Sequence, residues 1–343
     1  MPLHAAEKRF ILKDRKRLLK TSITILLVIA ILTGSFFVLK SFFGKSSSKQ
    51  PYIIVILKID PETMQFWQTV KAGIDTATKE FGCKVEIDAP KSEADVDGQI
   101  KIIEAAIKKR PDAIVLAASD YNKLVLEAQK IKKSGIKLIT VDSGINSDIS
   151  QSFIATDNVK AGEKEGQMLS ALLSQNSKIA IISSVNNAST AIDREKGLKL
   201  GLSKEQDSNI IGTFFSNSSY DEAYEITKDL LIKNPDLKGI AGLNEPSATG
   251  AARAIAELKL QDNVRLVGFD NSIDEIKYIE AGVIQGTVVQ KPFNMGYLCI
   301  KTAVEDVKGE KIDKRIDTDS VVITKTNMYS VENQKLLFPF AGK

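Results

Sequence analysis

Histidine is almost absent from this chain of 343 residues, and its only copy, His4, lies close to the N-terminus. A Ser-His-Asp triad, a Cys-His pair and a His-based zinc site each need an imidazole in the folded body. The rest of the chain therefore cannot form any of these three kinds of site. We expect no cofactor and no bound metal.

Cysteine is nearly as scarce, with only Cys83 and Cys299. The two thiols could form a disulfide in an oxidising compartment. Cys299, however, falls within an apolar helical pattern, and free cysteines are among the most buried residues. We expect two buried thiols. Neither cysteine directly follows the apolar run near the N-terminus, which excludes lipid attachment there.

That apolar run, Ile23–Leu39, holds no charge and follows a strongly basic leader. At about 1.5 Å per residue it is just long enough to cross the hydrocarbon core of a membrane. The basic residues ahead of it are Lys8, Arg9, Lys13, Arg15, Lys16, Arg17 and Lys20. This excess predicts a cytoplasmic leader at 1–20, a transmembrane anchor at 21–40, a linker at 41–51 and an extracytoplasmic body. We expect a single-pass protein of the cell membrane.

A cleaved signal peptide is the alternative interpretation of this N-terminal pattern. The sequence that follows the apolar run, Lys40–Lys45, has no small-x-small cleavage site. Its absence favours an anchor that stays attached to the body.

The composition of the body is that of an ordinary folded protein. Apolar residues make up 43% of the chain and charged residues 26%, and neither fraction suggests disorder. Most of the formal net charge of +4 comes from the leader, so the body is close to neutral. We expect no nucleic acid as a partner of the body.

From Tyr52 onward, short β-branched runs alternate with amphipathic helical stretches. The first run, Ile53–Leu57, is apolar throughout, as expected of a strand covered on both faces of a parallel sheet. The first series continues with expected helices at 66–81, 96–109 and 122–133 and strands at 84–87, 113–116 and 137–141. A second series has expected helices at 159–173, 193–202, 221–232, 246–258 and 273–281 and strands at 179–182, 210–214, 239–241, 265–267 and 287–289.

Two such series predict an α/β fold with two Rossmann-like, doubly wound lobes. A last helix at 293–307 and a last strand at 321–324 remain after the second series. If these two elements are shared between the lobes, the chain crosses from one lobe to the other several times.

Polar residues follow most of the expected strands. They are Asp60, Ser119-Asp120, Asp142-Ser143, Asn186, Asn244-Glu245, Asp270-Asn271 and Gln290. Ligands of open α/β sheets bind beyond the carboxyl ends of the strands, so these residues predict a polar ligand in a cleft between the lobes. At any one position, the side chain could instead cap the next helix or make a turn.

Several short segments recur in a specific order and spacing: Phe66-Trp67, Val141-Asp142-Ser143, Ile154–Asn158, Arg194–Leu198, Asn234-Pro235-Asp236, Asn244-Glu245, Val267–Asp270 and Gln290-Lys291-Pro292. Together they resemble the type I periplasmic binding-protein family. The similarity is to its ribose-, galactose- and xylose-binding members and covers roughly Tyr52 to Asn327. The resemblance implies two lobes joined by a three-crossing hinge, with crossings near 156–157, 290–291 and 319–320. The N-lobe is then 52–156 with 291–319, and the C-lobe is 157–290 with 320–343.

The resemblance also implies roles for seven of the eight residues that we expect to bind a monosaccharide. Phe66 and Trp67 match an aromatic pair that stacks on the sugar ring, and Asp142 and Asp270 match carboxylates that accept hydrogen bonds from hydroxyls. The others are Arg194, a donor to sugar oxygens, and the amides Asn244 and Gln290. Lys58 is the eighth residue of the expected site. Simpler alternatives remain: Trp67 as ordinary packing, Arg194 as a surface ion pair, and Asp270 as a helix cap.

The chain departs from the ribose-binding pattern at several positions. Ser143 replaces an arginine, Ala117 replaces an asparagine, and Asn217 or Ser218 replaces an aromatic residue. Lys58 stands where a small polar residue is common. These departures argue against ribose itself, and the resemblance to xylose-binding members at Trp67-Gln68 slightly favours a pentose such as xylose.

We therefore expect a binding protein and not an enzyme. The alternative is a glycoside-processing enzyme that uses Asp142 and Asp270 as its paired acids. A sugar-responsive transcription factor shares the two-lobe fold, but it carries a DNA-binding domain where this chain has its apolar run. As a binding protein, the chain could deliver sugar to an ABC permease or act as co-receptor of a membrane sensor histidine kinase. The sequence leaves this choice open.

Overall fold

The computed structural model of the chain describes residues 17, 20–21, 26–31, 33–35 and 50–338. The chain divides into two compact units, Met1–Gln50 and Pro51–Lys343. No helix among the described residues is both long enough and apolar enough to cross a membrane. Residues 22–25, 32 and 36–40 of the anchor predicted at 21–40 lie outside the described residues.

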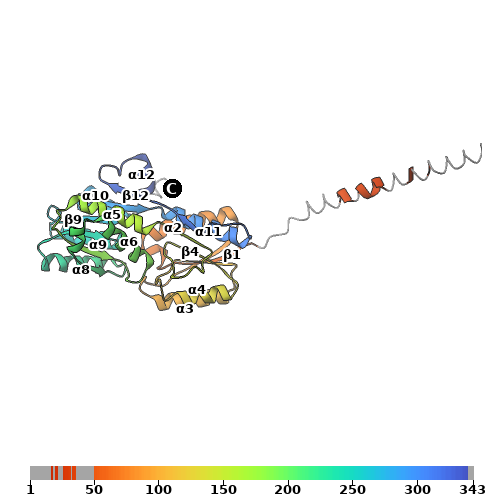
Figure 1. The fold of residues 1–343 in the computed structure, drawn as a ribbon, viewed down its shortest axis with the longest axis horizontal. Helices are drawn as coiled ribbons and strands as arrows, with labels where there is room; N and C mark the ends of the chain where they lie inside the picture. The colour runs from red at the N-terminus through yellow and green to blue at the C-terminus, as the bar shows by residue number, and fades with distance from the viewer. Residues whose placement is uncertain (1–16, 18–19, 22–25, 32, 36–49, 339–343) are drawn as a thin grey trace, which may run out of the picture. The chain divides into compact units, whose positions relative to one another are not determined.

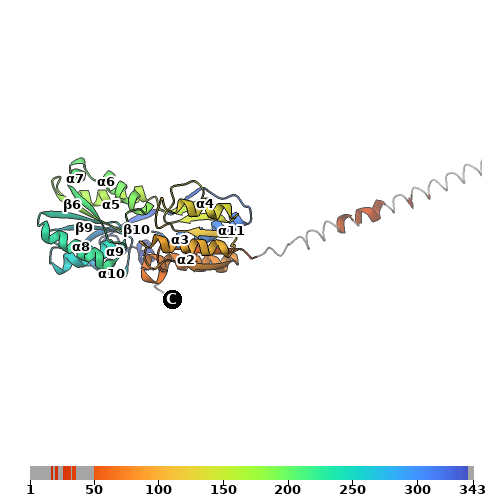
Figure 2. The ribbon, with the colours of Figure 1, turned by 90° about the horizontal axis from the view of Figure 1, so that it is seen from below.

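The second unit holds two six-stranded sheets (Figures 1 and 2). The first is entirely parallel, with strand order β2-β1-β3-β4-β5-β11. Its strands are β1 (Tyr52–Ile56), β2 (Lys84–Asp88), β3 (Ala113–Leu116), β4 (Lys137–Val141), β5 (Ser152–Ala155) and β11 (Arg315–Asp317). Its helices are η1 (Pro61–Thr63), α2 (Gln65–Phe81), α3 (Val96–Lys108), α4 (Val125–Lys133) and α11 (Pro292–Val307). We call this sheet and its helices the N-lobe.

The second sheet has the order β12-β10-β9-β8-β6-β7 and is parallel except for β12. Its strands are β6 (Lys178–Ser183), β7 (Ile210–Phe215), β8 (Leu237–Gly242), β9 (Arg265–Phe269), β10 (Ile284–Gln290) and β12 (Ser320–Thr324). Its helices are α5 (Asn158–Leu172), α6 (Ser189–Gly201), α7 (Lys204–Ser208), α8 (Tyr220–Lys233), α9 (Glu245–Glu257), α10 (Ile273–Glu280) and α12 (Val331–Leu337). We call this second group the C-lobe.

The chain passes between the lobes three times: from β5 to α5, from β10 to α11, and from β11 to β12. The three crossings contact one another. The hydroxyls of Thr156 and Thr318 lie 3.3 Å apart, and the Lys291 ammonium lies 3.2 Å from a carboxylate oxygen of Asp319. The crossings therefore form one bundle of three segments at the edge where the lobes join.

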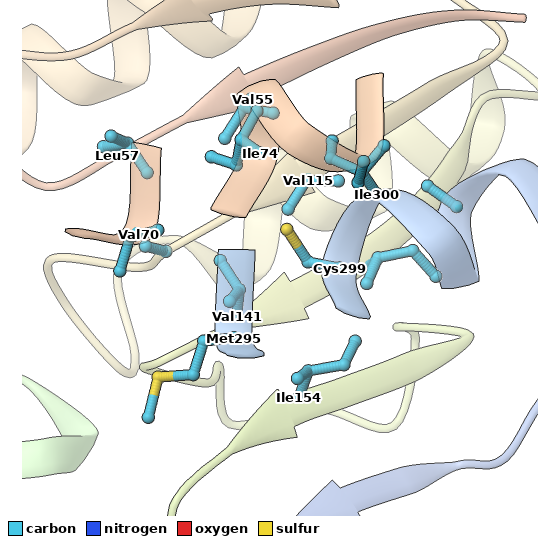
Figure 3. Close-up of a cluster of buried hydrophobic side chains, with 14 of the residues drawn as sticks. Val55, Leu57, Val70, Ile74, Val115, Val141, Ile154, Met295, Cys299 and Ile300 are labelled. Atoms are coloured by element: carbon cyan, nitrogen blue, oxygen red, sulfur yellow. The ribbon is translucent and has the colours of Figure 1, made fainter. Parts of the chain in front are cut away.

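The sheets are covered on both faces because their inner strands are apolar throughout. In β1, Ile53 and Val55 face one apolar cluster and Ile54 and Ile56 face another. Figure 3 shows the first cluster, in which Cys299 of α11 lies among side chains of α2 and the sheet. Both cysteines are buried and free, which confirms the prediction of two buried thiols. Burial raises the pKa of the Cys299 thiol.

Each lobe packs one pair of helices unusually closely through glycine. A methyl group on Gly73 of α2 would collide with the carbonyl of Phe293 in α11. Likewise, a methyl group on Gly197 of α6 would collide with the carbonyl of Val159 in α5. Because α2 and α6 also begin with residues that face the other lobe, these contacts fix the position of the site described next.

Candidate functional site

All eight side chains that the sequence predicted for the site surround one small cavity between the lobes. The space among them that is free of atoms is about 300 Å³, part of which is open to solvent. Its lining residues are Lys58, Met64, Phe66, Trp67, Glu93, Asp142, Ser184, Thr190, Arg194, Asn244, Asp270 and Gln290. A larger hollow near Arg110 and Lys137 lies at the amino ends of β3 and β4, opposite the end where open α/β sheets bind ligands.

On the N-lobe side, Lys58 and Asp142 form a buried ion pair. The ammonium lies 2.9 Å from an Asp142 oxygen and 4.0 Å from an oxygen of Glu93. Burial alone would lower the pKa of Lys58, but the Asp142 and Glu93 carboxylates outweigh it and the pKa is raised. Lys58 therefore stays positively charged inside the cavity.

The aromatic pair comes from the first turn of α2. The rings of Phe66 and Trp67 meet edge to face, with centroids 4.9 Å apart and an angle of 86° between their planes. The indole Nε1 of Trp67 donates to Glu93 at 3.3 Å. Trp67 also belongs to the apolar cluster of the N-lobe, so its ring is at once part of the core and part of the cavity wall.

On the C-lobe side, Arg194 of α6 is fixed by three groups. Its Nε donates to Asn158 and its Nη1 to the carbonyl of Leu243, each at 2.8 Å. Its guanidinium lies 3.7 Å from the centroid of the Phe269 ring. Arg194 is only 4% exposed, so the alternative of a surface ion pair is wrong.

Asp270 follows β9 and faces Arg194 at 3.7 Å from Nη1. One of its oxygens accepts a hydrogen bond of 2.6 Å from the amide of Gln290. Burial raises the pKa of Asp270, while Arg194 and Gln290 act in the opposite direction. The helix that follows is capped by Ser272, so the alternative of Asp270 as its cap is wrong.

The two amides are only partly engaged. Asn244 caps α9, because its Oδ1 accepts from the amide of Ser247, and its Nδ2 donates to the hydroxyl of Ser218. The Oε1 atom of Gln290 is buried without a hydrogen-bond partner. This carbonyl oxygen is an acceptor that a bound molecule could satisfy.

Asp142 and Asp270 share an uncommon backbone conformation. Their φ angles are +60° and +76°, in the left-handed region that residues other than glycine rarely adopt. Each directly follows the fourth strand of its lobe, and its amide bonds the carbonyl of the neighbouring strand, Ile154 or Val288. Strained backbone of this kind clusters at functional sites.

The lobes are in contact around the cavity. Ser218 of the C-lobe donates to Glu93 of the N-lobe at 2.6 Å. The amide of Gly144 donates to the hydroxyl of Ser189 at 2.9 Å, and the amide of Tyr121 to the carbonyl of Asn187 at 2.8 Å. The structure is therefore a closed form, in which the two lobes touch around the cavity.

Four further residues line the cavity that the sequence analysis did not select: Met64, Glu93, Ser184 and Thr190. Glu93 lies in the loop after β2, so the rule that selected polar residues after strands could have found it. Conversely, several residues that the rule did select lie elsewhere. Asp60 caps η1, and Asp120 accepts from the amides of Asn122 and Lys123 in a turn.

The chain matches the family model of the periplasmic binding protein domain over residues 53–311. It is 27% identical to the D-allose-binding periplasmic protein of Escherichia coli over 274 residues, which is 76% of this chain and 88% of that protein. It is 28% identical to the ribose import binding protein of Haemophilus influenzae over 82% of this chain and 94% of the relative.

Solved structures agree in fold. A sugar transporter structure from Clostridium phytofermentans is 43% identical with a TM-score of 0.76, covering 80% of this chain and 100% of that chain. A carbohydrate transporter solute-binding protein from Agrobacterium radiobacter, in complex with D-arabinose, is 32% identical with a TM-score of 0.80; the match covers 85% of this chain and 100% of that one. The alternative of a glycoside-processing enzyme is therefore wrong, and this chain belongs to the periplasmic binding protein domain family, a family of binding proteins and not of enzymes.

Proposed function

We propose that the chain binds one neutral monosaccharide in the cavity between its lobes, with a pentose such as xylose slightly favoured. The observation that carries this proposal is the composition of the cavity wall. Carboxylates, cations and amides converge from both lobes beside an edge-to-face aromatic pair.

This composition suits a sugar because each hydroxyl both donates and accepts hydrogen bonds. Carboxylates such as Asp142 and Asp270 accept from hydroxyls, Arg194 donates, and the amides of Asn244 and Gln290 can do both. The faces of Phe66 and Trp67 are apolar and suit the C–H face of a sugar ring.

The charges of the cavity favour a neutral ligand. Two cationic side chains, Lys58 and Arg194, stand against the carboxyls of Glu93, Asp142 and Asp270. Lys58 is already paired with Asp142, and Arg194 lies 3.7 Å from Asp270, so each cation of the cavity has a carboxylate beside it. A sugar acid or a sugar phosphate would face like charge in a site of low dielectric.

The names of the relatives support the same chemical class. They include proteins described as binding D-allose, ribose and xylitol and solved structures with bound D-arabinose and D-fucose.

We further propose that the chain is anchored in the cell membrane by its N-terminal apolar run, with the leader in the cytoplasm and the body outside. The basic leader supports this topology. In this position the chain would serve an ABC permease or act as co-receptor of a sensor histidine kinase. Membrane fractionation and the identity of the neighbouring genes test these two points separately.

We propose that the two lobes move relative to each other as rigid bodies. The N-lobe is then 52–156 with 291–319, and the C-lobe is 157–290 with 320–343. Three crossings that lie together support a hinge at this edge, about which the lobes separate to admit sugar. Closure then buries the ligand and presents a new surface to the membrane partner.

Calorimetric titration and thermal melting with D-xylose, D-ribose, D-arabinose, D-allose, D-galactose and xylitol test the proposal. At least one of them should bind with micromolar or tighter affinity, about −8 kcal/mol, and should raise the melting temperature. Gluconate and ribose 5-phosphate serve as acidic controls and should give no shift. If no neutral sugar or polyol shifts the melting temperature, the proposal is wrong.

A further inference from the structure

Glu245 is a buried carboxyl that the sugar site does not use. It is the first residue of α9 and is 2% exposed, yet it does not line the cavity. Its carboxyl faces the N-lobe instead. One oxygen accepts from the amide of Phe66 at 3.3 Å, and the other accepts from the hydroxyl of Tyr220 at 2.7 Å.

The helix that Glu245 meets has no cap of its own. The N-cap position of α2 is Met64, whose side chain makes no capping hydrogen bond. The first amides of a helix have no partner within the helix and carry a partial positive charge. Glu245 supplies to α2, from the opposite lobe, the acceptor that the N-lobe sequence does not provide.

The same exchange occurs in the other direction. Gln65, the first residue of α2, accepts through its Oε1 from the amide of Ile273 at 3.1 Å. Ile273 is the first residue of α10 in the C-lobe. Two helix N-termini, one from each lobe, therefore each take a side chain from across the cleft, and both contacts exist only while the lobes are together.

We propose that this reciprocal capping is a latch that holds the lobes closed, and that protonation of Glu245 tunes its strength. Only one consequence of the latch, its effect on sugar affinity, depends on the proposed function. Its effect on closure can be measured without any sugar.

The surroundings of Glu245 set the direction of this effect. The groups that face it are the Tyr220 hydroxyl from α8, the Asp270 carboxyl after β9, the Glu275 carboxyl from α10, and the α2 amides. Burial, with a further contribution from Asp270, raises the pKa of Glu245 from 4.5 to about 7, although the hydrogen bonds from Tyr220 and α2 oppose it.

When the lobes separate, Glu245 faces water and returns to its ordinary pKa. Closure therefore takes up a proton, because the pKa is higher in the closed form. The advantage of the closed form is complete below the ordinary pKa of 4.5 and is lost as the pH rises through about 7. In this range, acidification should favour the closed form and tighten sugar binding.

The test is a distance measurement on the full-length chain without sugar. Spin labels are placed at Leu126→Cys on α4 and Ile232→Cys on α8, which are 65% and 63% exposed and lie in different lobes. Cys83 and Cys299 are buried and should not react. Pulsed electron paramagnetic resonance then gives the closed-to-open ratio at pH 5.5 and pH 8. We expect the ratio to be about thirtyfold higher at pH 5.5.

Glu245→Gln, which keeps an acceptor but cannot titrate, should lose most of this pH dependence and stay as closed at pH 8 as the parent is at pH 5.5. Glu257→Gln, at the exposed end of the same helix, should behave like the parent. Equal pH dependence in the parent and in Glu245→Gln would overturn the latch, as would a ratio that rises with pH. These outcomes do not depend on sugar, so a failure of the latch is distinct from a failure of the sugar proposal.

Discussion

The two lobes build matched halves of one site from the same topological positions, and they use different chemistry to do so. In each lobe a carboxylate follows the fourth strand in a left-handed backbone conformation: Asp142 in one and Asp270 in the other. In each lobe the helix after the first strand faces the cavity. That helix carries the aromatic pair in the N-lobe and Arg194 in the C-lobe.

The carboxylates differ most in their partners. Asp142 is already neutralised by Lys58 at 2.9 Å, whereas Asp270 lies 3.7 Å from Arg194, whose Nε and Nη1 donate to other groups. The N-lobe half is therefore an ion pair with a second carboxylate, Glu93, 4.0 Å from Lys58, beside two rings. The C-lobe half keeps hydrogen-bonding capacity for a ligand.

The largest effect should come from breaking the N-lobe pair. Asp142→Ala leaves the Lys58 ammonium buried beside Glu93 alone, and removal of one partner of a buried pair costs about 3–5 kcal/mol. We expect that loss in the free energy of unfolding, measured with urea, together with loss of sugar binding. The double variant Lys58→Met with Asp142→Ala should recover most of the stability. If Asp142→Ala alone is as stable as the parent, the pair is not buried as described.

The matching change in the C-lobe should affect affinity more than stability. Asp270→Ala removes charge-assisted hydrogen bonds worth about 1.5–3 kcal/mol each, which corresponds to a tenfold to hundredfold weaker Kd. Because Ser272 and not Asp270 caps α10, unfolding should change little. Calorimetric titration and melting on the same samples separate the two effects. Loss of stability with unchanged affinity would contradict the assignment.

In both lobes, a larger side chain at the close helix–helix contact should destabilise the fold to a similar extent. Gly73→Ala and Gly197→Ala each place a methyl group against a backbone carbonyl of the partner helix. Overpacking of this kind costs about 1–3 kcal/mol of unfolding free energy. Thr76→Ala, on the exposed side of α2, is the control and should change little. If Gly73→Ala leaves the free energy of unfolding unchanged while Gly197→Ala lowers it, the helices of the N-lobe are packed less tightly than those of the C-lobe.

The smallest effect should come from the aromatic wall. Trp67→Leu keeps an apolar side chain in the core but removes the ring face, and aromatic contacts are worth about 0.5–1.5 kcal/mol beyond burial. Sugar affinity should therefore fall about threefold to tenfold. Phe81→Leu, at the other end of α2 and outside the cavity, should leave affinity unchanged. A loss of affinity in both variants would point to a general disturbance of the helix.

Much of the fold was predictable because the inner strands are continuous apolar runs. The run Ile53–Leu57 predicted β1 to within one residue, and the predicted strand at 137–141 coincides with β4. The short strands β5 and β11 were not predicted as strands. They have three or four residues each and depend on pairing with each other across a long stretch of sequence.

The eight selected residues came from resemblance and from the strand-end rule, and the structure brings them together. The contacts between lobes were not predictable in the same way. Glu93 and Ser218 follow β2 and β7, the matching edge strands of the two sheets, and their loops meet across the contact between the lobes. Relative placement of two lobes is a long-range property that local sequence patterns do not encode.

The threefold crossing of the chain has a consequence for the order in which the protein can be completed. The N-lobe begins the sequence, but α11 and β11, which fill its core and extend its sheet, follow nearly all of the C-lobe. A nascent chain that ends at Gln290 therefore exposes the apolar face around Val70 and Ile74 that Met295 and Ile300 later cover. During synthesis or export, the N-lobe therefore cannot complete its core and sheet until about the last sixth of the sequence has been added. Until then its exposed apolar face favours aggregation.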